Sequence, residues 1–162
     1  MSFKLRRQGP VLRISASAED WESVHRALER LRASLARREY PLAEGPGPGA
    51  AFADEPALRD ELAGVLDASV AEQKFDQTEA FERTLREREG ARGTIRVPLD
   101  GVDRWLACLN DLRLMLAAEL HIDHGWPTPL PANRSDPRIP DWMLFHHLTE
   151  LEVDILDGLL DR

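Results

Sequence analysis

The chain has a single cysteine and no long apolar run. One thiol excludes a disulfide within the chain, which suits a reducing compartment. No stretch approaches the roughly 18 apolar residues that a membrane-spanning helix requires. The opening segment, Met1–Arg7, is basic but lacks the apolar core of a signal peptide. We therefore expect a cytoplasmic protein that does not contact a membrane.

Acidic residues outnumber basic ones, and the two signs are unevenly distributed. The net charge of the 162 residues is −8. Residues 1–40 hold nine basic and five acidic side chains, whereas residues 41–162 hold twelve and twenty-four. Lys4, Arg6, Arg7 and Arg13 form a short basic arm. A duplex DNA binder needs several phosphate contacts, and an acidic body repels the DNA backbone. Direct nucleic-acid binding is therefore not expected.

Hydrophobic periodicity predicts a mainly α protein. Apolar residues recur every three or four positions in several segments, which is the spacing of amphipathic helices. The first predicted helix is about twenty residues long and begins after Ser17 or Ala18. A second helical region begins at Pro56, and Asp76–Glu89 continues or restarts it. The last two predicted helices are Leu99–Ile122 and a helix from about Asp141 to the end. The predicted strands are Phe3–Arg7 and Val11–Ser15, which flank a Gln-Gly-Pro turn, and Thr94–Val97.

We expect one domain over residues 1–162. It is a bundle of three to five helices with a small N-terminal β-hairpin extended by one later strand. Two segments interrupt it, a flexible Gly/Pro loop at about 43–53 and a Pro-rich loop at about 123–140. The apolar seam Trp21–Leu35 either closes the core or pairs two chains, so a homodimer is compatible with the sequence.

The third predicted helix places polar residues where an amphipathic helix has apolar ones. At about 100° per residue, Arg113 falls inside the apolar face and Asn110 at its edge. A buried, unpaired cation is prohibitive, so Arg113 must snorkel or pair with a carboxylate of the last helix, such as Glu150, Glu152 or Asp154. Asn110, Arg113, Glu150 and Glu152 form a candidate polar core. It is either a structural ion pair that sets helix register or an anion site that uses the guanidinium fork.

Two other side chains are candidates for function. Cys108 is a candidate redox thiol or a small buried hydrophobe, and as the lone thiol it could act only between molecules. Trp126, in the Pro-rich loop, either folds onto the body or stays exposed as a candidate anchor for a partner.

The sequence lacks the residue patterns of the common catalytic and cofactor sites. It has no Gly-x-Ser-x-Gly elbow, no activated Cys/His pair and no phosphate-binding glycine loop. His121 and His124 straddle a helix end, and His146 and His147 have no second ligand pair at a diagnostic spacing. We therefore predict no catalytic, cofactor-binding or metal-binding residues, and no enzyme activity.

Two motifs resemble those of a known family. Arg96-Val97-Pro98-Leu99 and the helical segment Trp105–Leu114 look like segments of an actinobacterial family that was first catalogued as a domain of unknown function. Its members include oxidative-stress transcriptional regulators (AosR-like). The resemblance implies a regulator that acts through protein contact with a sigma factor or RNA polymerase. Switching through an internal disulfide does not carry over, because Cys108 stands alone.

The missing catalytic motifs, the acidic body and this resemblance predict a non-enzymatic protein-interaction domain that acts in transcriptional control through protein contacts. The alternative is a metal- or small-molecule-binding helical bundle, centred on Arg113 or the histidine clusters. Stoichiometric zinc or iron in protein purified without an affinity tag would favour that alternative.

Overall fold

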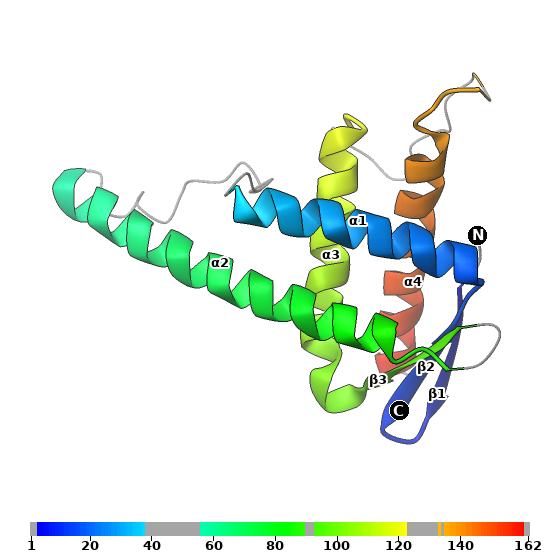
Figure 1. Ribbon diagram of the computed structural model, residues 1–162. Helices are drawn as coiled ribbons and strands as arrows, with labels where there is room; N and C mark the ends of the chain where they lie inside the picture. The colour runs from blue at the N-terminus through cyan, green and yellow to red at the C-terminus, as the bar shows by residue number, and fades with distance from the viewer. Residues whose placement is uncertain (1–2, 38–55, 90–92, 123–132, 134, 161–162) are drawn as a thin grey trace.

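The computed structural model describes residues 3–37, 56–89, 93–122, 133 and 135–160, and the side chains of 56–68 are not described (Figure 1). The elements are β1 Lys4–Gln8, β2 Val11–Ser15, α1 Ala18–Ala36, α2 Pro56–Arg86, β3 Thr94–Pro98, the 3-10 turn η2 Leu99–Gly101, α3 Val102–Glu119 and α4 Ile139–Leu160. This confirms the mainly α class with a hairpin and one later strand. The predicted loop at 43–53 and most of the loop at 123–140 lie outside the described residues.

The three strands form one antiparallel sheet in the order β1-β2-β3, as predicted. Gly9 has a φ of +60° in the turn between β1 and β2, a conformation that glycine adopts without steric cost. Side chains alternate between the two faces of a strand. Leu12, Ile14, Ile95 and Val97 therefore point to the same face, where they are buried in the core. The opposite face carries mostly polar and charged side chains, together with Val11 and Pro98.

The helix α1 begins at a capping box, in agreement with the predicted start. Ser17 Oγ accepts a hydrogen bond from the backbone N–H of Asp20 (3.1 Å), and Asp20 Oδ2 accepts one from the backbone N–H of Ser17 (3.4 Å). The apolar seam Trp21–Leu35 is buried within the chain and so forms part of its core. Trp21 Nε1 donates a hydrogen bond to the carbonyl oxygen of Gly93, which ties α1 to the start of β3.

The helix α2 is continuous over 31 residues, so the charged segment from Asp76 continues the region from Pro56 and does not restart it. Phe81 and Leu85 are buried, as their spacing predicts. Phe81 also stacks on Trp105 of α3, with ring centroids 4.6 Å apart. Figure 1 shows the N-terminal part of α2 extending beyond the end of α1. The C-terminal half of α2 is therefore the part that packs on the bundle.

The helix α3 contacts α1, α2 and α4, which agrees with the wide apolar face of its sequence. The turn η2 replaces the first predicted turn of this helix. The helix α4 runs antiparallel beside α3 (Figure 1). It begins at Ile139, two residues before the predicted start, because Pro140 fits the first turn of a helix. Trp21, Trp105 and Trp142 are all buried, so the tryptophans of three helices meet the core.

Candidate functional site

The outward side of the sheet is lined by nine residues that alternate with the buried ones, and we call it the open sheet face. Its residues are Lys4, Arg6 and Gln8 of β1, Val11, Arg13 and Ser15 of β2, and Thr94, Arg96 and Pro98 of β3. Each is exposed or half-buried. Four of the nine are cations and none is a carboxylate. This face therefore differs in charge from the acidic chain as a whole.

The strand register places three arginines side by side across the open sheet face. Arg6 is the cross-strand partner of Arg13, and Arg13 is the partner of Arg96. Neighbouring strands lie about 4.8 Å apart, so the three side chains start from one line perpendicular to the strands. Like charges directly opposite each other destabilise a strand pair. The folded sheet therefore holds an unfavourable charge arrangement that an anionic ligand would relieve.

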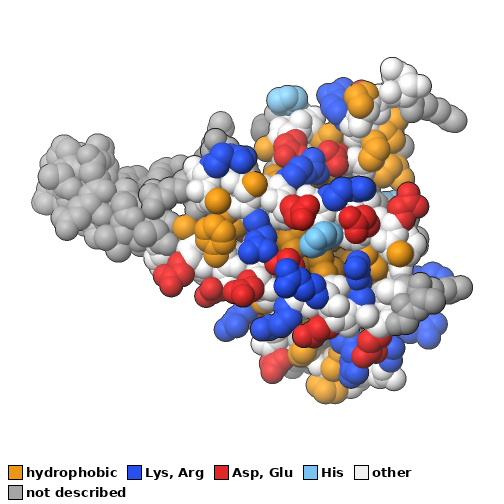
Figure 2. Space-filling model, in the orientation of Figure 1, with side chains coloured by type: hydrophobic (Ala, Val, Ile, Leu, Met, Phe, Trp, Pro, Cys, Tyr) orange, Lys and Arg blue, Asp and Glu red, His pale blue; other side chains and the backbone are white. Residues whose placement is uncertain are grey.

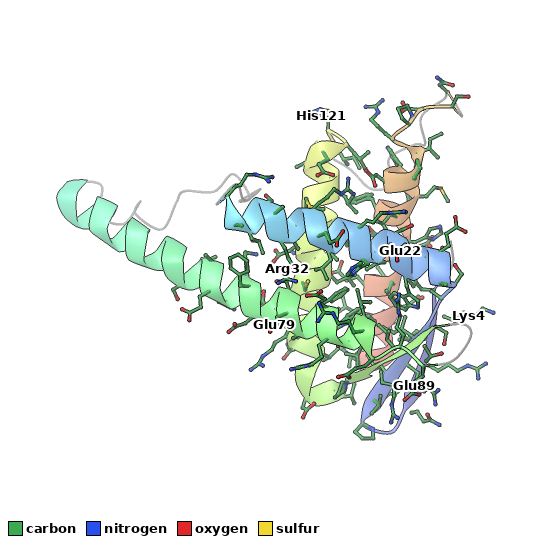
Figure 3. The ribbon with its side chains drawn as sticks, in the orientation of Figure 1. Lys4, Glu22, Arg32, Glu79, Glu89 and His121 are labelled. Atoms are coloured by element: carbon green, nitrogen blue, oxygen red, sulfur yellow. The ribbon has the colours of Figure 1, made fainter. Side chains whose placement is uncertain are left out.

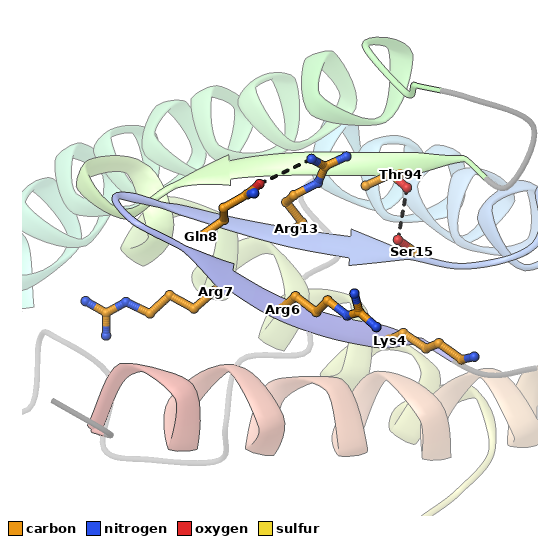
Figure 4. A pocket seen from close by; sticks show the side chains of 7 residues that line it. All are labelled: Lys4, Arg6, Arg7, Gln8, Arg13, Ser15 and Thr94. Carbon is orange, nitrogen blue, oxygen red and sulfur yellow. Dashed lines mark hydrogen bonds between the residues drawn. The ribbon is translucent and has the colours of Figure 1, made fainter.

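Neighbouring polar groups hold part of this face in place (Figure 4). Arg13 Nη1 donates a hydrogen bond to Gln8 Oε1 at 3.2 Å, which fixes one end of the guanidinium. The hydroxyls of Ser15 and Thr94 share a hydrogen bond of 2.9 Å across β2 and β3. These residues, together with the basic side chains of β1, line a hollow of about 530 Å³. The hollow is partly open to solvent.

The two edges of the sheet differ in how their basic residues are engaged. Arg7 Nη1 donates a hydrogen bond to the carbonyl oxygen of Gly158 (3.3 Å), near the C-terminus of α4, where a cation interacts favourably with the helix dipole. At the β3 edge, Glu89 Oε1 lies 3.9 Å from Arg96 Nη1, and both side chains are more than half exposed. Such an exposed pair contributes little. Arg7 is therefore a structural tether, whereas Arg96 remains open to a ligand.

The described part of the face shown in Figure 2 carries charges of both signs. On the face shown in Figure 2, basic and acidic side chains are interspersed over α1 and α2. Several of these charges pair with each other, as in the contact of Arg30 with Asp141 at 2.9 Å. The row of arginines on the sheet arises from the pairing of the strands.

The candidate polar core is built around Arg113, which reaches from α3 to α4. Arg113 forms an ion pair with Glu152, and its Nε donates a hydrogen bond to Thr149 Oγ1 at 3.0 Å. The Thr149 hydroxyl in turn donates to the carbonyl oxygen of Phe145 at 2.8 Å. Burial lowers the pKa of the Arg113 guanidinium from its usual value. The predicted tie between the two helices is therefore present, with Thr149 as a member that sequence reasoning missed.

Two predicted members of this polar core lie outside it. Glu150 is exposed and pairs with His147, whose Nδ1 lies 3.0 Å from Glu150 Oε2. Asn110 is exposed on α3. Placing them in the core is therefore wrong. The reason is angular, since Glu152, and not Glu150, shares the helix face of Thr149 that meets α3. Asn110, at the edge of the predicted face, turns to solvent.

Cys108, the candidate redox thiol, is completely buried in the core. Burial raises the pKa of the thiol, and the nearby Asp111 carboxylate raises it further. The reactive thiolate is therefore strongly disfavoured in the folded protein. This environment is typical of an inert, buried cysteine.

The histidines belong to no metal-binding group in the described part of the chain. Figure 3 shows His121 at the end of α3 away from the sheet. His146 stacks on Trp142, with ring centroids 4.3 Å apart. Among the residues whose positions are described, no three His, Cys, Asp or Glu side chains form a group that could hold a metal ion. His124 and Trp126, the candidate partner anchor, lie outside the described residues.

The helices that the structure describes include none long and apolar enough to span a membrane.

The fold is a mainly helical domain whose small sheet has a buried apolar face and a basic open face. The chain belongs to the family described as a domain of unknown function, DUF2017, whose sequence model matches residues 48–159. The match covers α2, β3, α3 and α4, and therefore Arg96, whereas β1, β2 and α1 precede it. No curated protein and no solved structure matches the chain.

Proposed function

We propose that this domain is a non-enzymatic protein-interaction domain and that the open sheet face is its contact surface. The row formed by Arg6, Arg13 and Arg96 carries the proposal. These like charges oppose the pairing of the strands on which they lie. Carboxylates of a bound partner would offset that repulsion, because an arginine fork forms charge-assisted hydrogen bonds with a carboxylate.

The charge of the whole chain favours a protein partner over a nucleic acid. The open sheet face supplies four cations, whereas the chain carries a net charge of −8. A nucleic acid extends beyond a small patch, so its remaining phosphates would meet the acidic surface and be repelled. The face also has no aromatic side chain on which a base could stack. A compact acidic surface of a protein satisfies the same arginines without these costs.

The resemblance to AosR-like regulators supports a more specific form of the proposal. In this form the domain is a cytoplasmic transcriptional regulator of the oxidative-stress type, and its partner is a sigma factor or RNA polymerase. The burial of Cys108 supports a role through protein contact over one through thiol chemistry. Regulation would then depend on the amount of the domain or of its partner.

The proposal is tested by comparing three forms of the protein in capture experiments from the native host. Arg13→Gln removes the middle charge of the row, and Arg26→Gln removes one exposed charge of α1 as a matched control. We expect a stoichiometric partner with the wild type and with Arg26→Gln, and its loss with Arg13→Gln. Binding must then be reproduced with the purified partner. Equal capture by all three proteins, or no stoichiometric partner, would overturn the proposal.

A stability measurement separates loss of a contact from loss of the fold. Because Arg13 lies between two like charges, Arg13→Gln should raise the free energy of unfolding, by roughly 0.2–1 kcal/mol. A variant that loses its partner while it gains stability identifies the residue as a binding residue. Destabilisation by Arg13→Gln would show that Arg13 supports the sheet instead.

A further inference from the structure

The open sheet face also indicates what kind of segment it binds. We infer that its ligand is a short, extended acidic peptide with carboxylates on alternate residues, a more specific statement that rests on the function proposed above. Extended peptides place every second side chain on one face, at a repeat of about 6.6–6.8 Å. Lys4 and Arg6 lie two residues apart on β1, so the cations along this strand have the same repeat.

The cations that lie across the sheet are also close enough to share carboxylates. Arg6, Arg13 and Arg96 span two strand spacings, about 10 Å in all. Neighbouring arginines start about 4.8 Å apart, so one carboxylate can bridge two of them, whereas the outer pair is farther apart than the roughly 6.6–6.8 Å repeat of an extended chain. A compact anion such as a single phosphate would engage only part of this array.

Uncharged groups on the face add donors for such a peptide. Ser15 and Thr94 share one hydrogen bond, so one of their two hydroxyl hydrogens remains free to donate to a ligand. Gln8 Oε1 accepts the hydrogen bond from Arg13, so the amide hydrogens of Gln8 can still donate to a ligand. The hydrogen bond that Arg13 donates to Gln8 also restricts Arg13 before the ligand arrives, and preorganisation of this kind lowers the entropic cost of binding.

Binding of labelled peptides to the full-length protein tests the inference by fluorescence anisotropy. The probe is a ten-residue peptide that alternates glutamate and serine, and its control alternates glutamine and serine. A ten-nucleotide oligothymidylate tests a nucleic acid on the same face. We expect the acidic peptide to bind at least about tenfold more tightly than the glutamine peptide or the oligonucleotide, with affinity that falls as salt rises.

Variants then locate the site. Arg13→Gln should weaken binding of the acidic peptide roughly tenfold, and Arg6→Gln combined with Arg13→Gln should abolish it. Arg26→Gln should leave the affinity within about twofold, since an exposed charge on α1 is screened from the sheet. Circular dichroism and thermal unfolding confirm that each variant is folded.

Each outcome decides between the alternatives. Equal affinity for the two peptides, tighter binding of the oligonucleotide, or an equal loss with Arg26→Gln overturns the inference. If the peptide fails to bind while Arg13→Gln still loses the captured partner, the interaction function stands and the extended acidic segment is wrong. If the peptide binds while Arg13→Gln keeps every captured partner, the site is real but the proposed function is wrong.

Discussion

Glu152→Gln removes the negative charge that pairs with Arg113 between α3 and α4. The side chains of Arg113 and Glu152 are 22% and 18% exposed, so the pair lies between the buried and the exposed extremes. Removing one partner of a fully buried pair costs about 3–5 kcal/mol, because the other charge stays buried without compensation. Fully exposed pairs contribute about 0–1 kcal/mol.

We therefore expect Glu152→Gln to lower the free energy of unfolding by roughly 2 kcal/mol, between these limits. For a domain of this size the midpoint of thermal unfolding should fall by roughly 4–8 °C. The measurement is urea and thermal unfolding followed by circular dichroism. Glu150→Gln is the matched control on the same helix, because the Glu150 side chain is 63% exposed. It should cost less than about 0.5 kcal/mol.

A double variant shows whether the loss of free energy of unfolding comes from the charge of Arg113 that Glu152→Gln leaves unpaired. Arg113→Met combined with Glu152→Leu replaces both charges by apolar side chains of similar size, which is often neutral or stabilising. The double variant should therefore be more stable than Glu152→Gln alone. A loss below about 0.5 kcal/mol for Glu152→Gln, or a double variant less stable than the single one, would refute the reasoning.

The remaining predictions concern Gly93, Cys108 and Asp136. Both Gly9 and Gly93 have a positive φ, and Gly9→Ala should lower the free energy of unfolding by roughly 1–2 kcal/mol. Gly93→Ala should lower it further, because a Cβ at Gly93 would lie 2.8 Å from Trp21 Cδ1. Equal losses in urea unfolding would contradict this contact. Cys108 should react with an aromatic disulfide reagent only as fast as the protein unfolds, since burial raises the pKa of its thiol, and rapid reaction of the folded protein would contradict the burial. Hydrogen bonds from Arg138 lower the pKa of Asp136 to about 2. The wild type should therefore have a higher free energy of unfolding than Asp136→Asn. This difference should be complete above the unfolded pKa of about 4 and vanish as pH falls toward 2. Unfolding midpoints measured from pH 6 to pH 2 test this, and a difference that persists at pH 2 or grows on acidification would show that another group is responsible.

Local sequence determined the elements of this protein because each depends on residues close together in the chain. The period of three and four between Trp21 and Leu35 predicts a helix face that the structure buries. Ser17 and Asp20 form the cap that begins the helix, a contact between residues three apart. The position of Arg113 on an apolar face also predicts that it has a partner, since a buried cation requires one wherever the chain folds.

Tertiary structure alone decided which residues meet across the chain. Arg113 had three candidate carboxylates, and the face that α4 turns toward α3 selected Glu152. The basic arm predicted near the N-terminus was incomplete, because Arg96 joins Arg6 and Arg13 only through the pairing of β2 with β3. Register turns a scattered set of basic residues into a row on one face of the sheet. Strand pairing across more than eighty residues is not encoded in local periodicity, so the sequence determined the helices and strands, and only the fold created the basic face.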